Sequence, residues 1–352
     1  MKMHTSTLWK SLLMTLSLSA ASAMAAEVEL KIHHFLPPPS TAHSQFIQPW
    51  ADKVMKESNG RIDIKIYPAM QLGGKPPQLF DQVRDGVADI VWTVPGYTRG
   101  RFPLTEVFEL PFVAGSAEAT SQAAWEFYEK YMREEYQDVH PILIHTHAPG
   151  QFHMRDKPIK TLADLQNTKV RAPTRTINEA LNVVGATPVG MPVPAVPQAL
   201  SKGVVDGAML PYEVTLPLKV HQLVKFHTEI GGGRGIYTAM FLFAMNKQKY
   251  DSLPDDLKQV IDNNSGLALA QQIGAAWDQA DNPGREAARK NGNQFNTIEG
   301  EELERWKIAT RPVVDNWIKA MDERGLNGQQ MYDDARALVG KYSREEPKQA
   351  QK

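Results

Sequence analysis

The chain of 352 residues contains no cysteine, which excludes disulfides, thiolate nucleophiles and cysteine metal sites. Its charges nearly cancel, with 39 basic and 40 acidic residues, and nothing in this balance indicates a nucleic-acid partner or a polybasic membrane patch. Beyond the N-terminus there is no run of about 18 apolar residues, the length that a membrane-spanning helix needs. Stability must therefore come from core packing, for which hydrophobic residues make up 42% of the chain.

The N-terminus has the pattern of a secretory signal. Lys2 and Lys10 flank a short apolar stretch at 11–21, and Ala23 and Ala25 give the small-x-small spacing of a cleavage site. The apolar stretch is too short for a membrane anchor. We expect residues 1–25 to be a signal peptide, so that the mature chain is periplasmic, with no direct membrane insertion after cleavage. Loss of the two lysines leaves 37 basic and 40 acidic residues, a net charge near −3.

The mature chain is longer than one hydrophobic core usually serves, so two domains are expected. Alternating segments predict strands at 28–33, 62–66, 88–92, 169–171 and 204–209, with helices between them. Two similar segments, 85–89 (DGVAD) and 202–206 (KGVVD), follow a predicted helix and precede a predicted strand. This repeat favours two similarly built α/β lobes, with a ligand between them near the carboxyl ends of both sheets.

The last third of the chain is expected to be helical. Apolar residues from Leu257 to Trp277 form a long stripe, which Pro283 and Gly284 should break or kink. Earlier in the chain, Pro49 indicates that a helix begins near Gln48 or kinks there. Residues 343–352 lack large apolar side chains and are expected to be disordered.

Arg171 is the strongest candidate for a binding residue. It lies at the end of a predicted strand that Pro173 should terminate, and Thr174 or Thr176 can cap the next helix. A guanidinium at such a place can hold a carboxylate through two parallel hydrogen bonds. The pattern alone leaves open an ordinary surface arginine or a salt bridge between the lobes.

The histidines suggest a metal site only weakly. His145 and His147 lie on one face of a strand, a spacing that could hold zinc, but no acidic ligand or His-Glu-x-x-His motif accompanies them. A neutral histidine that binds a ligand, or a structural histidine, fits better, so no metal and no cofactor are expected. No nucleophile elbow, carboxylate pair or phosphate loop is present, and the glycines at 231–235 fit a hinge between lobes. A zinc-dependent periplasmic enzyme remains the alternative from another class.

Several segments together resemble the solute-binding proteins of tripartite ATP-independent periplasmic (TRAP) transporters, the C4-dicarboxylate-binding (DctP-like) family. They are 67–74 (YPAMQLGG), 100–112 (GRFPLTEVFELPF), 169–173 (KVRAP), 185–191 (GATPVGM) and 199–207 (ALSKGVVDG). The resemblance extends from about Glu29 to Tyr342. It implies an α/β, two-lobed periplasmic binding protein fold of the class II type, with a long helix packed across both lobes.

The resemblance also implies discontinuous lobes, because the chain crosses between them more than once. We expect lobe I at 27–147 plus about 236–275, and lobe II at 148–235 plus about 276–342. The implied function is capture of an organic acid and its delivery to TRAP membrane subunits, without enzymatic activity, by a protein expected to be a monomer. A receptor could replace the transporter as partner if the protein serves a sensor.

Arg171 matches the arginine that typically binds the substrate carboxylate in this family. Gln151 stands where sialic-acid binders have a second arginine, and Leu210 where they carry asparagine. We therefore expect a monocarboxylate with an apolar or aromatic part, while dicarboxylates and sulfonates remain open. Glu213 would tolerate a hydroxyl or amino group. The expected ligand-binding residues are Arg171, Gln151, His34, Trp92, Tyr97, His147, Met191, Tyr212, Glu213 and Phe241, and Met240 could enlarge the pocket.

Overall fold

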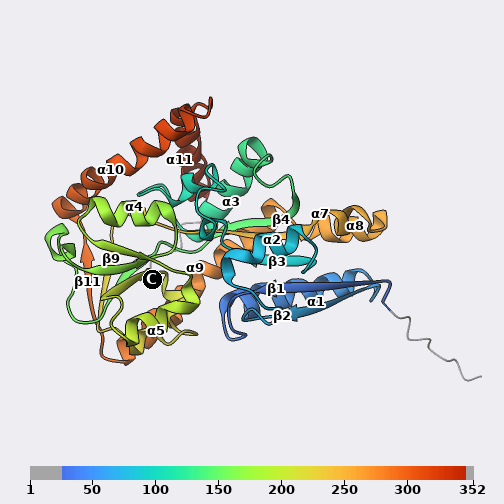
Figure 1. The fold of residues 1–352 in the computed structure, drawn as a ribbon, viewed down its shortest axis with the longest axis horizontal. Helices are drawn as coiled ribbons and strands as arrows, with labels where there is room; N and C mark the ends of the chain where they lie inside the picture. The colour runs from blue at the N-terminus through green and yellow to red at the C-terminus, as the bar shows by residue number, and fades with distance from the viewer. Residues whose placement is uncertain (1–25, 346–352) are drawn as a thin grey trace, which may run out of the picture.

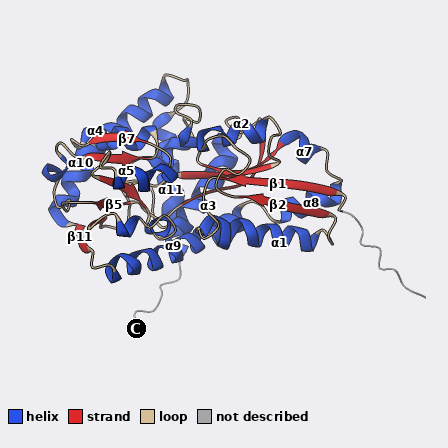
Figure 2. Cartoon of the chain, turned by 60° about the horizontal axis from the view of Figure 1, so that its bottom comes forward, coloured by secondary structure: helices blue, strands red, loops and turns tan. Residues whose placement is uncertain are grey.

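The computed structural model describes residues 26–345 and contains two β-sheets that lie at opposite ends of the molecule (Figure 1). The predicted signal peptide at 1–25 and residues 346–352 lie outside the described part. Helices pack around both sheets (Figure 2). A further helix, α9, lies between the sheets.

The first sheet has the strand order β2-β1-β3-β10-β4. Its strands are β1 (Val28–His34), β2 (Ile62–Tyr67), β3 (Ile90–Thr93), β4 (Val139–Thr146) and β10 (Met240–Asn246). Strands β1, β2 and β3 are parallel, and Ile32 lies between Ile66 and Ile90. Strand β10 is antiparallel to both β3 and β4.

The second sheet has the order β11-β9-β5-β8-β6-β7. Its strands are β5 (Gln151–Met154), β6 (Lys169–Ala172), β7 (Thr187–Gly190), β8 (Gly207–Leu210), β9 (Phe226–Ile230) and β11 (Gln294–Ile298). Here β6 is parallel to β7 and β8, whereas β5 is antiparallel to β8 and β9. Arg171 in β6 lies between Val189 and Ala208.

The two sheets repeat one topology. In each sheet, an antiparallel strand lies beside three parallel strands, and the chain enters that strand directly from the other sheet. Thus β5 of the second sheet follows β4 of the first in sequence, and β10 of the first sheet follows β9 of the second. The fold is thus the predicted two-lobed arrangement, although the residue limits given above for each lobe stay predictions.

The repeated sequence segments occupy matching places in the two sheets. The Asp89 side chain accepts a hydrogen bond from the Lys31 N–H at 2.8 Å, and the Asp89 N–H donates to the Lys31 carbonyl at 3.1 Å. Asp206 forms the same two bonds with Lys169, at 2.8 and 2.7 Å. Each aspartate therefore joins the beginning of a sheet's third parallel strand to the strand beside it.

The helices occupy the connections between strands and the C-terminal third. The α-helices are α1 (Gln48–Glu57), α2 (Leu79–Arg84), α3 (Ala117–Phe127), α4 (Arg175–Val183), α5 (Val196–Ser201), α6 (Tyr212–Thr215), α7 (Lys247–Asp251), α8 (Asp255–Asn263), α9 (Leu267–Lys290), α10 (Gly300–Asp322) and α11 (Gly328–Glu345). The shorter 3-10 or π turns are η1 (Ala42–Ile47), η2 (Pro76–Gln78), η3 (Pro95–Tyr97), η4 (Thr105–Glu109), η5 (Tyr128–Met132), η6 (Leu162–Leu165), η7 (Val193–Ala195) and η8 (Val220–Gln222). The π turn η1 runs directly into α1 at Gln48, so Pro49 lies at the point where regular α-helix replaces the wider π turn.

The predicted break at Pro283 is wrong, because α9 continues through it to Lys290. Close packing against α3 and against α6 accounts for the position of α9 across the two lobes. A Cβ on Gly274 would lie 2.5 Å from the Ala117 carbonyl oxygen at α3, and one on Gly284 would lie 2.1 Å from the Tyr212 carbonyl oxygen at α6. The absence of side chains at these glycines lets α9 approach the backbone of both lobes.

Two further details differ from the sequence predictions. Thr174 occupies the N-cap position of α4 but forms no side-chain cap bond. The predicted disordered tail is wrong for residues 343–345, which extend α11, whereas 346–352 lie outside the described residues. Within residues 26–345, no helix combines the length and apolar character needed to cross a membrane.

Candidate functional site

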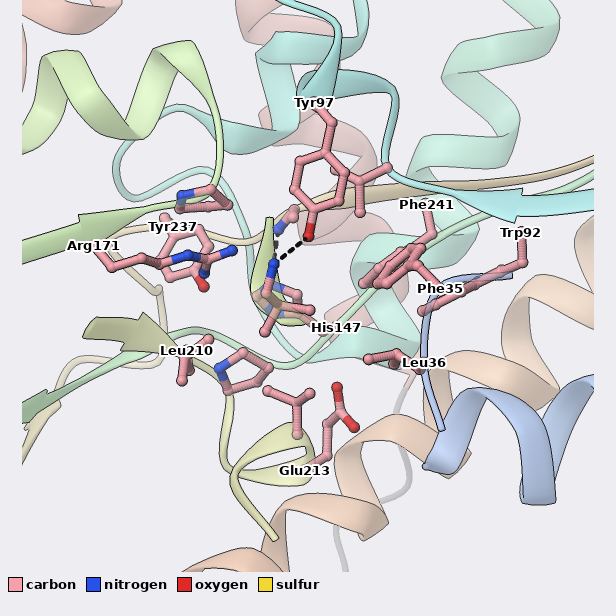
Figure 3. Close-up of a pocket in the computed structure, with 16 residues that line it drawn as sticks. Phe35, Leu36, Trp92, Tyr97, His147, Arg171, Leu210, Glu213, Tyr237 and Phe241 are labelled. Atoms are coloured by element: carbon pink, nitrogen blue, oxygen red, sulfur yellow. Dashed lines mark hydrogen bonds between the residues drawn. The ribbon is translucent and has the colours of Figure 1, made fainter. Parts of the chain in front are cut away.

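A cavity lies between the two sheets, and the space between atoms there is about 370 Å³, part of which is open to solvent. Residues from both sheets, and from loops at the carboxyl ends of their strands, surround it (Figure 3). This is the location that the strand–helix pattern predicts for a ligand. The lining residues are Phe35, Leu36, Trp92, Val94, Tyr97, His147, Arg171, Pro173, Val193, Leu210, Pro211, Glu213, Val214, Tyr237, Ala239 and Phe241.

Arg171 brings a buried positive charge to the cavity. Its side chain is 1% exposed, with Nε donating to the Met191 carbonyl at 3.0 Å and Nη1 donating to the Met209 carbonyl at 3.1 Å. Nη2 is buried without a hydrogen-bond partner, and Arg171 forms no ion pair within residues 26–345. The two carbonyls fix the plane of the guanidinium, and its charge and free N–H groups remain available for an anion.

Aromatic rings form an apolar wall. Trp92 stacks between Phe241, at 4.6 Å between ring centroids, and Phe35, at 4.8 Å. The Trp92 indole N–H donates to His145 Nε2 at 2.9 Å, so its polar atom is satisfied outside the cavity. Figure 3 shows these three rings on one side of the space that Arg171 enters from another. The arrangement suits a flat apolar group.

Two tyrosines lie beside the guanidinium. The Tyr97 hydroxyl accepts a hydrogen bond from the Val193 N–H at 3.1 Å, and the positive charge of Arg171 acts on it. The Tyr237 hydroxyl donates to the Met209 carbonyl at 3.1 Å, the same carbonyl that Arg171 contacts. Burial raises the pKa of both phenols, so they remain neutral donors or acceptors.

His147 lines the cavity, but both its ring nitrogens already have partners. Nε2 accepts from the Ala239 N–H at 3.0 Å, which leaves Nδ1 to donate to the Ala148 carbonyl at 2.5 Å. Burial lowers the pKa of His147 to about 4, and the neutral ring serves as a wall. His147 was expected to hydrogen-bond a ligand, but in this arrangement neither ring nitrogen is free to do so.

Glu213 places a carboxyl group at the cavity. Its side chain is 5% exposed, and Oε2 is buried without a hydrogen-bond partner. Burial, and then the charge of Asp281, raise the pKa of Glu213 to about 8, so the group is mainly protonated at neutral pH. The Glu213 N–H donates to Asp281 Oδ1 on α9 at 2.8 Å, which fixes the start of α6.

Six of the ten predicted site residues line the cavity: Arg171, Trp92, Tyr97, His147, Glu213 and Phe241. Met191 is not among the lining residues, but its carbonyl orients Arg171. Met240, the additional candidate, is a buried residue of β10 outside this lining.

The other three predicted residues are engaged elsewhere. Gln151 donates to the Pro149 carbonyl at 3.0 Å and accepts from the Ile230 N–H at 2.8 Å, so it ties β5 to neighbouring backbone. His34 bonds to His43, and the Tyr212 hydroxyl donates to Glu229 at 3.1 Å. None of the three belongs to the cavity lining.

Sequence reasoning missed several lining residues. Phe35 and Leu36 directly follow β1, and the ends of predicted strands could have identified them. Tyr237 had no such signal, because its position depends on a glycine-rich crossing and on close packing against Gly150. Among the described residues, no three histidine, aspartate or glutamate side chains form a group that could hold a metal ion.

Comparison with known proteins relates the chain to solute-binding proteins. The family description "Bacterial extracellular solute-binding protein, family 7" matches residues 32–320. A marine metagenome TRAP solute-binding protein from an unidentified microbe, specific for aromatic acid ligands and solved with 3-hydroxybenzoate, is 51% identical, covers 90% of this chain and 99% of its own, and has a TM-score of 0.89. A variant of that protein was solved with metahydroxyphenylacetate.

Two further solved TRAP proteins bind aromatic acids. The protein from Rhodoferax ferrireducens T118, with copurified benzoate, is 48% identical over 91% of this chain and 99% of its own, with a TM-score of 0.89. The periplasmic protein from Bordetella bronchiseptica, with bound mandelate, is 29% identical over 89% of this chain and 99% of its own, with a TM-score of 0.83. Their ligands each combine a carboxylate with an aromatic ring.

Proposed function

Since this chain belongs to the bacterial extracellular solute-binding proteins of family 7 and is a TRAP solute-binding protein rather than an enzyme, we propose that it captures an aromatic monocarboxylate. The ligand lies in the cavity between the sheets, with its carboxylate on Arg171 and its ring among the apolar side chains.

The observation that carries this proposal is the buried guanidinium of Arg171. Burial of an unpaired charge is costly, and the two backbone carbonyls supply hydrogen bonds but no opposite charge. A carboxylate bound to the free Nη2 supplies both a partner and a counter-charge. The protein should therefore bind an anion more strongly than a neutral analogue of the same shape.

The apolar wall favours an aromatic remainder. Trp92, Phe241 and Phe35 present rings rather than hydrogen-bonding groups, because the Trp92 N–H is already satisfied by His145. Benzoate, hydroxybenzoate and mandelate in the similar proteins are ligands of this kind.

A C4-dicarboxylate fits less well. Arg171 is the only permanent cation among the described residues that line the cavity, and His147 is neutral. A second carboxylate would be buried near Glu213 and Asp281 without a positive partner. An aromatic sulfonate shares the anion chemistry of a benzoate, and it belongs in the test for that reason.

The remaining steps follow the family. Residues 1–25 direct export to the periplasm, and the liganded monomer delivers its cargo to the TRAP membrane subunits. Ligand shifts the protein toward the closed arrangement only by its greater affinity for that arrangement. Contacts from both sheets around one cavity provide this differential affinity.

A thermal-shift series tests the ligand class. Benzoate, 3-hydroxybenzoate, benzenesulfonate and succinate are compared at equal concentrations with the mature protein. A ligand at 100 times its Kd adds about 2.7 kcal/mol of stability. We expect the largest shifts from the aromatic carboxylates. A larger shift from succinate than from both carboxylates would overturn the proposal, and a larger one from benzenesulfonate would replace the carboxylate with a sulfonate.

A further inference from the structure

We propose that Glu213 determines specificity within the aromatic-acid site, by binding a hydroxyl group on the ligand ring. This inference rests on the proposed function, because it takes the carboxylate on Arg171 as given. It adds a second polar contact that distinguishes hydroxylated aromatic acids from unsubstituted ones and from diacids.

The position of Glu213 is fixed independently of any ligand. Pro211 precedes α6, and the N–H of Glu213 is held by Asp281 of α9 at 2.8 Å. In Figure 3 Glu213 approaches the cavity from below, Arg171 enters from the left, and the rings of Phe35, Trp92 and Phe241 lie on the right. A ring held by Arg171 therefore presents another part of its edge to Glu213.

The free valence of Glu213 is the second observation. Oε2 is buried and has no hydrogen-bond partner of good geometry, although the Thr41 and Trp277 side chains lie close to the carboxyl, and Trp277 Nε1 is likewise buried without a partner. A buried polar atom without a partner costs free energy that a ligand group can recover. An unsubstituted benzoate ring cannot hydrogen-bond, so it leaves Oε2 unsatisfied, whereas a ring hydroxyl donates to it.

The charge state agrees with a neutral partner. Burial raises the pKa of Glu213 to about 8, so the carboxyl group both donates and accepts at neutral pH. A hydroxyl also donates and accepts, and the two groups pair without any net charge. A ligand carboxylate at the same place would add a negative charge beside Asp281 of α9, with no cation in the described cavity lining to offset it.

Isothermal titration calorimetry of benzoate and its three monohydroxy isomers tests the inference. We expect at least one isomer to bind the wild-type protein about ten-fold more tightly than benzoate, the value of one hydrogen bond to a buried group. Glu213→Leu should reduce this ratio of Kd values to about one. Glu213→Gln, whose amide donates and accepts, should retain most of it.

A ligand-side control does not depend on the folding of a variant. The fluorobenzoate with fluorine at the favoured position has a similar size but no donor, and it should bind the wild-type protein like benzoate. The inference is overturned if no hydroxy isomer exceeds benzoate, if the fluoro analogue matches the hydroxy one, or if Glu213→Leu keeps the ratio. Those results leave benzoate binding intact, whereas failure of all these acids to bind the wild-type protein would overturn the proposed function itself.

Discussion

At the scale of single residues, burial controls which groups carry charge. Arg171 keeps its charge in the interior, while burial raises the pKa values of Glu109 and Glu213 to about 8 each. Glu109 lies in η4, beside Thr174 at the N-cap of α4. The Oε2 atom of Glu109 is buried without a hydrogen-bond partner of good geometry. Arg171 therefore remains a buried cation that can bind an anion, whereas Glu109 and Glu213 are mainly neutral at pH 7.

Glu109 should make stability depend on pH. Its pKa is about 8 in the folded protein and near 4.5 in the unfolded chain, so the folded state binds more protons between these values. Its contribution is fully present below about pH 4.5 and is lost as the pH rises to about 8. We expect Glu109→Gln to lose less stability than wild type between pH 5 and pH 9, by at least about 1 kcal/mol in urea unfolding. Equal losses in both proteins would contradict this assignment.

The chemistry of individual residues could be predicted only in part. Arg171 was identifiable because strand-terminating Pro173 follows it closely and places it at a sheet edge. The role of His147 was not, because its tautomer depends on Ala239, which lies 92 positions away in sequence. Gln151 was expected to face the ligand, but its amide binds the backbone of Pro149 and Ile230 and does not line the cavity.

At the scale of elements, α9 connects the two lobes through its side chains. Asp278 accepts hydrogen bonds from the N–H groups of Ala117 and Glu118 at the start of α3, at 2.7 and 2.9 Å. Asp281, three residues later, accepts from Glu213 at the start of α6. Carboxylates stabilise helix N-termini, so one stretch of α9 holds a helix start in each lobe.

The two glycines of α9 should therefore tolerate little change. Gly284→Ala would place Cβ 2.1 Å from the Tyr212 carbonyl oxygen, which forces α6 away from α9. We expect a loss of ~1–3 kcal/mol in the free energy of unfolding, measured by urea denaturation. Gly340→Ala is the matched control, because it also lies in a helix but would meet only the Arg234 side chain, at 3.8 Å. A loss no greater for Gly284→Ala than for the control would refute this account of the packing.

Most helices and strands could be predicted from the sequence, and the wrong prediction of a break at Pro283 has a physical cause. Alternating residues predicted the strands β1 and β2, and the helices expected between the predicted strands include α1 and α4. Pro283 was misread because local preference argues against proline inside a helix. Contacts of α9 with both lobes, through Gly274 and Gly284, stabilise the helix across that position, and local sequence does not show them.

At the scale of the whole molecule, an ion pair outside the cavity connects the parts of the chain that carry the two sheets. Arg175 at the start of α4 pairs with Glu106 of η4, which follows the first sheet's β3, and Arg175 Nε lies 3.0 Å from Glu106 Oε1. Glu106 is buried, so loss of Arg175 leaves its carboxyl without its hydrogen-bonded cation. This pair joins the two sheets' structural units without lining the cavity.

Removal of this pair should weaken binding at a distance. We expect Arg175→Ala to raise the Kd for benzoate by about five-fold, because a contact present in the closed arrangement is lost. Arg311→Ala removes an exposed pair with Asp315 inside α10 and should leave the Kd unchanged. Fluorescence or calorimetric titration measures both. If Arg175→Ala binds as tightly as the Arg311→Ala control, the pair has no role in closure.

The overall arrangement was predictable because the chain repeats itself. The segments ending at Asp89 and Asp206 marked two similar sheets, and in the structure both sheets have three parallel strands beside an antiparallel one and the same pair of bonds to the aspartate. The family resemblance supplied the two-lobed fold. Only part of the cavity wall could be read in the same way, because Phe35 follows a predicted strand whereas Tyr237 reaches the cavity through a crossing of the chain.

The most direct test of the account is a calorimetric titration of benzoate into wild-type protein, Arg171→Lys and Arg171→Ala. Loss of one partner of a buried charged pair should weaken binding about a hundredfold or more in Arg171→Ala. Arg171→Lys should also bind poorly, since an ammonium lacks the planar two-pronged geometry that the Met191 and Met209 carbonyls orient. Binding of benzoate by Arg171→Ala with the wild-type Kd would contradict the claim that this arginine holds the ligand's carboxylate.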